Sequence, residues 1–68
     1  MIRIDTCGMS CPQPVLMTKK SLENNPEGVD IIVDNNVAKG NVARFLKSAG
    51  YNASIIEKED TFIIEARK

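Results

Sequence analysis

The spacing of hydrophobic and polar positions changes several times along the chain and divides it into strands and helices. Residues 1–5 alternate apolar and polar side chains, which predicts a half-buried strand. From Pro12 the apolar positions take helical spacing, and Pro26 and Gly28 end this helix. Residues 29–34 are almost continuously apolar, which predicts a strand with neighbours on both sides.

The second half of the chain predicts one more helix followed by two strands. Asn35 or Asn36 is the expected N-cap of a helix that ends at Gly50. The apolar positions of this helix recur every three or four residues: Ala38, Val42, Phe45, Leu46 and Ala49. Residues 53–58 and 61–67 predict two strands joined by a short hairpin.

The resulting βαβαββ order predicts an α/β (α+β) fold. Two helices can cover one face of four short strands, so we expect a two-layer sandwich with a four-stranded mixed sheet and both helices on one face. The other face should stay partly open and carry Arg3, Ser54 and Thr61. At 68 residues the chain has room for one domain, residues 1–68, and for no deep substrate cavity.

Charge and composition exclude several function classes. Nine Lys and Arg balance nine Asp and Glu, so the overall field attracts neither nucleic acid nor anionic membrane. The absence of histidine removes Cys-His proteases and common Cys/His zinc sites, and we expect no metal and no cofactor. Apolar runs are too short to span a bilayer, and two cysteines fit a reduced, cytoplasmic setting.

The segment around Cys11 carries the clearest chemical signal. Cys11 stands at the predicted N-cap, followed by Pro12, Gln13 and Pro14. The two prolines have no N–H, so Gln13 is the main backbone donor near the sulfur, and the positive end of the helix dipole favours the thiolate. A thiol that is partly ionised near neutral pH suits sulfur exchange. The alternative is a small capping residue with a first-turn proline, although Ser, Asp or Asn would cap better.

Asp5, Gly8, Cys11, Pro12 and Pro14 form the pattern D-x-x-G-x-x-C-P-x-P, which resembles the signature of the TusA-like (SirA-like) sulfur-carrier family. The resemblance covers essentially the whole chain, and it implies a single TusA-like βαβαββ domain. Residues 11–20 and 33–35 are most similar to the N-terminal domain of YedF-type proteins, which are associated with selenium metabolism.

The resemblance implies that Cys11 carries a persulfide, supported by Pro12, Gln13, Pro14, Gly8 and Asp5. The implied partners are transient: a sulfur donor such as a cysteine desulfurase, and an acceptor protein. A DsrE-like domain or protein is a further implied partner, since YedF-type proteins have such a domain after this one. The chain would then act as a sulfur carrier in a sulfur or selenium transfer pathway rather than as a turnover enzyme.

Other charged and thiol side chains allow two interpretations each. Cys7 is a resolving thiol for Cys11 or a buried residue at the end of a strand. Asp5 and Asp34 stand where predicted strands end and helices begin, where turn or capping chemistry explains them, although they could line a site. The basic residues of the second predicted helix would dock an acidic partner or form a solvated surface: Lys39, Arg44 and Lys47.

Two function classes therefore stay open. The first is the sulfur carrier that loads Cys11. The second is a non-catalytic regulatory module that binds RNA or protein through the open sheet face or the basic helix. Only three aromatic residues are present, which argues against RNA, because single-stranded RNA is recognised by stacking on aromatic side chains.

Overall fold

The computed structural model describes residues 2–9 and 13–68. Its elements in chain order are β1 (Arg3–Asp5), α1 (Gln13–Asn24), β2 (Gly28–Val33), α2 (Asn36–Ser48), β3 (Asn52–Glu57) and β4 (Phe62–Arg67). The predicted βαβαββ order is confirmed, with boundaries within two residues of those expected. The predicted helix start at Pro12 lies outside the described residues.

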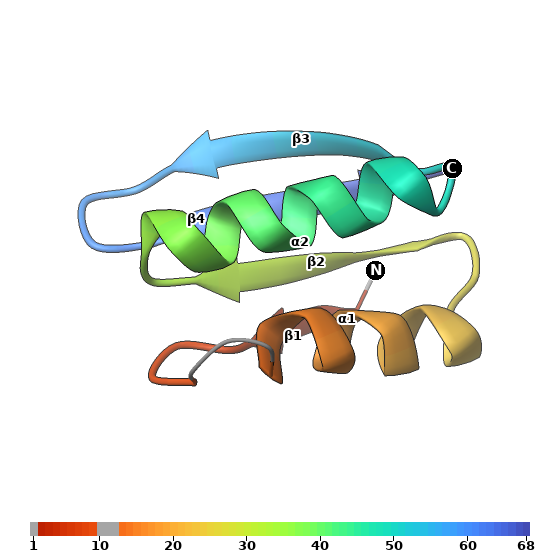
Figure 1. Ribbon diagram of the computed structural model, residues 1–68, viewed down its shortest axis with the longest axis horizontal. Coiled ribbons are helices and arrows are strands. Elements are labelled where there is room, and N and C mark those ends of the chain that lie inside the picture. The colour runs from red at the N-terminus through yellow and green to blue at the C-terminus, as the bar shows by residue number, and fades with distance from the viewer. Residues whose placement is uncertain (1, 10–12) are drawn as a thin grey trace.

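The four strands form one mixed sheet in the order β1-β2-β4-β3. β1 runs parallel to β2, whereas β4 is antiparallel to both β2 and β3. β2 is therefore an interior strand, as its apolar run predicts. Both helices lie on the same face, with α1 packed against β2 and α2 against β3 and β4 (Figure 1). This arrangement is the predicted two-layer sandwich.

The hydrophobic core fills the space between the helices and the sheet. Alternate residues of β2 face the helices and are completely buried: Val29, Ile31 and Val33. The other buried apolar residues come from every remaining element except β3: Ile4, Leu22, Ala38, Val42, Leu46, Ile64 and Ala66. Ala49, one of the apolar positions predicted for this helix, lies outside the core. Ala49 is exposed just beyond the end of α2, where its N–H bonds to the carbonyls of Phe45 and Leu46.

The opposite face of the sheet is covered by neither described helix. The strand register places Arg3, Asp30 and Ser54 in one row on this face, as expected for Arg3 and Ser54. Asp30 is buried, and its carboxylate lies 2.9 Å from a guanidinium nitrogen of Arg67 and 3.8 Å from one of Arg3. Thr61 lies just before β4 rather than within it. The ion pairs compensate the buried charge on the open face.

Gly28 begins β2 in a conformation that other residues adopt with strain. Its φ is 140°, and a Cβ atom there would collide with the backbone carbonyl of Ala66 on β4. Gly28→Ala should therefore lower the free energy of unfolding by about 2 kcal/mol or more in urea titrations. Gly40→Ala is the matched control, because a Cβ there meets only the Arg44 side chain, at 3.8 Å. It should stabilise the α2 interior by roughly 0.5–1 kcal/mol, and equal losses for both variants would contradict this account.

Candidate functional site

The loop after β1 is anchored to the end of β2 by Thr6. This residue is buried, its N–H donates to the Ile32 carbonyl at 2.9 Å, and its Oγ1 hydroxyl donates to the same oxygen at 2.6 Å. The Thr6 carbonyl in turn accepts the Met9 N–H at 3.2 Å. A hydroxyl and an amide on one carbonyl fix where the chain leaves the sheet, so the loop leading to Cys11 starts from a defined point.

Two carboxylates hold the next two amides of this loop. Asp5 Oδ1 accepts the Cys7 N–H at 2.9 Å, in the Asx-turn pattern expected of an aspartate at a strand end. Asp34 Oδ2 accepts the Gly8 N–H at 2.8 Å from the segment that follows β2. Gly8 adopts a φ of 82°, in the left-handed region that favours glycine. The turn at Gly8 is thus closed by two acidic side chains.

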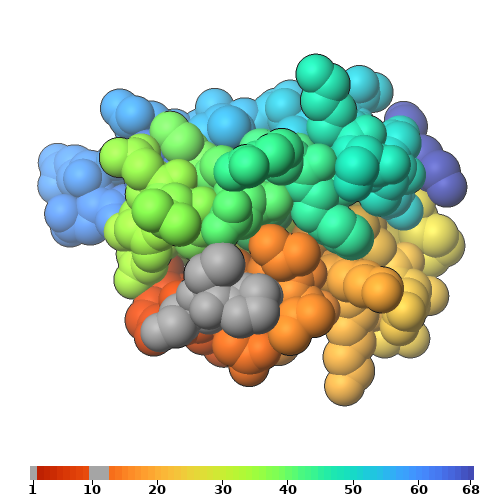
Figure 2. Space-filling model, viewed as in Figure 1, coloured from red at the N-terminus to blue at the C-terminus, as the bar shows by residue number. Residues whose placement is uncertain are grey.

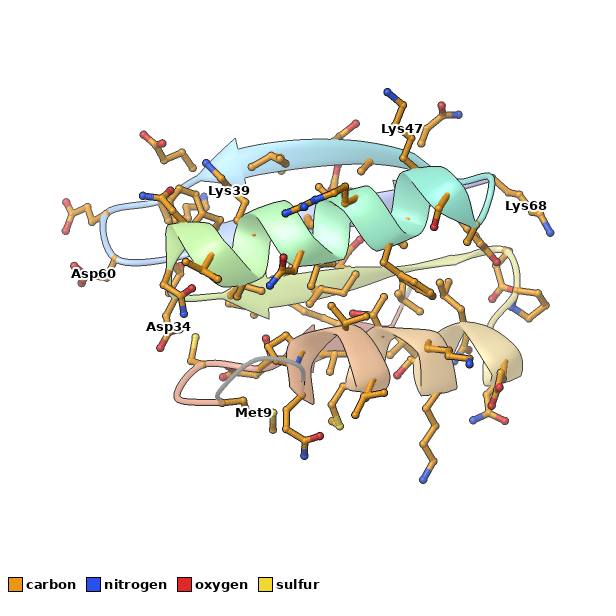
Figure 3. All side chains as sticks on the ribbon, in the orientation of Figure 1. Met9, Asp34, Lys39, Lys47, Asp60 and Lys68 are labelled. Carbon is orange, nitrogen blue, oxygen red and sulfur yellow. The ribbon has the colours of Figure 1, made fainter. Side chains whose placement is uncertain are left out.

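The same network reaches the start of α2. Asn35 Oδ1 accepts the Ala38 N–H at 2.7 Å, so Asn35 is the N-cap of α2. Its amide nitrogen donates to Asp34 Oδ1 at 3.1 Å. Asp34 therefore joins the Gly8 amide to the capping residue, and Figure 3 shows it at this end of the molecule, which it shares with Met9. The loop and the α2 N-terminus are tied into one unit.

Cys7 lies in this turn with its side chain exposed and its thiol free. The alternative prediction of a buried residue at a strand end is therefore wrong. Desolvation, a hydrogen bond to Asp5 and the negative charges of Asp5 and Asp34 raise the pKa of Cys7 to about 11. The hydrogen bond from the Cys7 backbone lowers the pKa of Asp5, which keeps that carboxylate ionised at neutral pH. Cys7 is therefore a protonated, weakly nucleophilic thiol at neutral pH.

α1 begins at Gln13, two positions after Cys11. Gln13 is exposed, whereas Pro14 is buried and its carbonyl accepts the Thr18 hydroxyl at 2.8 Å. The first turn of α1 is thus fixed from inside the fold, and it lies at the same end of the molecule as the β1 loop (Figure 1). Cys11 and Pro12 lie outside the described residues, as does the predicted approach of the Gln13 amide to the sulfur.

The three basic residues of α2 have different surroundings. Lys39 is half-buried, with its ammonium 4.5 Å from the centre of the Phe62 ring, so the alternative of a solvated surface does not hold for this residue. Arg44 is exposed and donates to Asn41 Oδ1 at 3.1 Å. Lys47 is exposed near the far end of α2 from Asp34 (Figure 3). Only Lys39 lies near the loop end of the helix.

Sequence reasoning misses the part played by Thr6 and gives Asp34 only a local capping or turn role. The hydrogen bond by which each of them holds the loop joins it to a residue 26 positions away in the chain. A Thr directly after a strand and an Asp directly after the next strand are weak signals alone. The parallel pairing of β1 and β2 is what brings the two strand ends together.

The described residues contain no cavity and no group of three His, Cys, Asp or Glu side chains arranged to hold a metal ion. Within the described part of the chain, neither helix is long and apolar enough to cross a membrane. In the space-filling view, the described residues of α1 and α2 show no hollow on this face of the molecule (Figure 2).

Comparison with known proteins agrees with this architecture. The model of the family described as "Sulfurtransferase TusA" matches residues 2–68. The chain belongs to the TusA family. A candidate sulfur carrier protein of Methanocaldococcus jannaschii is 38% identical to it over 71 residues, covering 100% of this chain and 95% of that protein. The crystal structure of a SirA-like protein from Desulfitobacterium hafniense matches with a TM-score of 0.90 and 31% identity, covering 98% and 96% of the two chains.

Membership of the TusA family supports a sulfur carrier role, and it implies transient sulfur donor and acceptor partners. The similarity to a SirA-like protein confirms the fold and the family that the D-x-x-G-x-x-C-P-x-P pattern suggests. The particular closeness to YedF-type proteins stays a prediction, and so do the cytoplasmic location and the DsrE-like partner.

Proposed function

We propose that this TusA-family protein carries sulfane sulfur as a persulfide on Cys11 and passes it to an acceptor protein. The observation that best supports the proposal is the hydrogen-bonded loop before Cys11. Thr6, Asp5 and Asp34 hold residues 6–9 against the ends of β1 and β2, and α1 begins two residues after Cys11. A thiol between two fixed segments can be presented to different partners without a binding pocket of its own.

Both transfers are displacements at sulfur and need no external oxidant or reductant. The Cys11 thiolate attacks the outer sulfur of a persulfide on the donor, a new S–S bond forms, and the donor thiolate leaves. In the second step a nucleophile of the acceptor attacks the outer sulfur of the Cys11 persulfide and releases the Cys11 thiolate. The carrier returns to its starting state, as expected for a relay protein. A cysteine desulfurase is the class of donor that this chemistry favours.

Loading is tested by incubating the protein with a cysteine desulfurase and cysteine and measuring its intact mass. A carrier should gain about 32 Da, one sulfur atom, and lose it on treatment with dithiothreitol. Omitting cysteine supplies the control for sulfur already present. A protein that gains no reducible sulfur while the desulfurase is shown to be active would contradict the proposal.

Lys39, Arg44 and Lys47 stay the proposed docking residues for an acidic partner surface. Arg44 is the sharpest probe, because Lys39 also packs on Phe62. Arg44→Glu should slow sulfur transfer roughly two- to five-fold at low ionic strength, and the defect should shrink as salt screens the charges. Glu23→Lys, an exposed charge reversal on α1, is the control. Equal transfer rates for Arg44→Glu and the parent at low salt would exclude docking through this part of α2.

A further inference from the structure

The two edges of the sheet are protected to very different degrees. β1 is three residues long and carries exposed charges at Arg3 and Asp5. β3 has six residues, all exposed, and its register with β4 is continuous. It contains no proline and no basic residue, and Ile55 and Ile56 are 45% and 39% exposed. Natural proteins usually protect such an edge with charges, proline or bulges, so β3 is a strand open to pairing.

The hydrogen bonds of the sheet show which groups of β3 face outward. The Lys58 N–H donates to the Thr61 carbonyl at 2.8 Å and closes the β3–β4 hairpin. In an antiparallel ladder, hydrogen-bonded pairs recur at every second residue, so Ile56, Ser54 and Asn52 bond to β4. The residues between them direct both their N–H and C=O groups away from β4: Ala53, Ile55 and Glu57. Among the described residues, Figure 1 shows no element beyond β3 on this side.

We propose that β3 pairs antiparallel with β3 of a second copy of this chain, with Ile55 opposite its own copy. A two-fold axis perpendicular to the sheet keeps each residue on its own face. In this register Ala53 lies opposite Glu57 of the second copy, and each outward-facing residue pairs with another outward-facing residue. If Ser54 instead of Ile55 lay opposite its own copy, Glu57 would have no outward-facing β3 residue opposite it. The register centred on Ile55 therefore gives the largest number of outward-facing N–H and C=O groups a hydrogen-bond partner on the second copy.

The charges beside β3 complement one another under the same symmetry. Glu57 pairs with Phe62, whose ring contacts Lys39 of α2, so Glu57 lies on the helix-covered face at the end of β3. Lys47 lies near the start of β3, and Figure 3 shows its side chain extending past the edge of that strand. Antiparallel pairing brings Glu57 of the second copy toward this end. Each Lys47 would face the Glu57 carboxylate of the other copy, and the pairing needs nothing from the sulfur-carrier proposal.

Sedimentation velocity in reducing buffer tests the pairing. The mean mass should rise from near 7.5 kDa toward twice that value between about 10 μM and about 1 mM protein. Ile55→Pro removes an N–H that faces away from β4, and edge strands tolerate proline at such positions. This variant should stay monomeric while keeping the circular dichroism spectrum of the parent. Val37→Lys, at an apolar residue that is 66% exposed on α2, is the control and should dimerise normally.

A charge exchange tests the register. Lys47→Glu and Glu57→Lys should each weaken association several-fold at low salt, and the double variant should restore it. A double variant as weak as either single change would overturn the proposed register. A parent that stays monomeric at about 1 mM would overturn the proposal itself and leave the edge to a strand of another protein. Association that survives Ile55→Pro in a folded chain would overturn it as well.

Discussion

Sulfur loading is expected to disappear when Cys11 is replaced by Ser. The hydroxyl of Ser does not attack a persulfide sulfur at neutral pH, whereas a thiolate does. Ser is also a better helix N-cap than Cys, so the variant should keep the circular dichroism spectrum and unfolding midpoint of the parent. After incubation with a desulfurase and cysteine, intact mass should show no reducible gain of about 32 Da.

The second thiol makes this experiment decisive. Cys7 remains in the Cys11→Ser variant, and Cys7→Ser leaves Cys11 as the only thiol. Cys7→Ser should load as the parent does. If Cys11→Ser still gained sulfur to the same extent while Cys7→Ser did not, the carrier would be Cys7, despite the pKa of about 11 that makes it a weak nucleophile at neutral pH.

The fold could be predicted because its signals are local. The apolar run of β2 indicates an interior strand, Asn35 indicates the start of α2, and the two-residue gap before residue 61 indicates a hairpin. Each signal depends on residues within a few positions of one another. Where the local pattern fails, as at Ala49, the helix ends one residue earlier than the apolar spacing suggests.

The details of the site depend on contacts that spacing does not encode. Asp34 meets Gly8 only because β1 and β2 run side by side and end at the same edge, and the strand order is not a property of either segment. The same is true of Lys39, whose helical position suggests a solvated cation but whose ammonium lies over the Phe62 ring of β4. Sequence patterns suggest the candidate motif, while the tertiary fold decides which side chains meet around the loop that precedes it.

The carboxylates around the loop also affect the chemistry of the two cysteines. A Cys7 thiolate could attack the inner sulfur of a Cys11 persulfide, form a Cys7–Cys11 disulfide and release hydrosulfide. The carboxylates of Asp5 and Asp34, which accept the amides of Cys7 and Gly8, disfavour that thiolate. The network that holds the loop would therefore also protect the proposed persulfide. Replacing one carboxylate should change both the loop geometry and the ionisation of the Cys7 thiol. Substitution by Asn separates the two effects, because it removes the charge and keeps a hydrogen-bond acceptor.

Cys7 is expected to alkylate slowly at neutral pH and to titrate far into the alkaline range. In Cys11→Ser, where Cys7 is the only thiol, the rate with iodoacetamide should rise with pH toward a midpoint near 11. The sign follows from the causes of the shift: desolvation, the hydrogen bond to Asp5 and the negative carboxylates all favour the neutral thiol, so a higher pH is needed to form the thiolate. Compared with a thiol at the ordinary value of 9.0, the thiolate fraction at pH 7.5 should be about 100-fold lower.

Removing the charges should reduce the shift in the pKa of Cys7 while the fold remains. Adding Asp5→Asn and Asp34→Asn to Cys11→Ser should lower the midpoint from about 11 and speed alkylation at pH 7.5 roughly several-fold, while desolvation, the largest cause of the raised pKa of Cys7, keeps the midpoint above 9.0. Asp60→Asn, in the hairpin between β3 and β4, is the matched control and should leave the rate unchanged. A midpoint near 9.0 in folded Cys11→Ser, with both carboxylates present, would show that Cys7 ionises as readily as an ordinary thiol. The carboxylates would then hold the loop without protecting the persulfide, and discharge of Cys11 by Cys7 would have to be prevented by geometry alone.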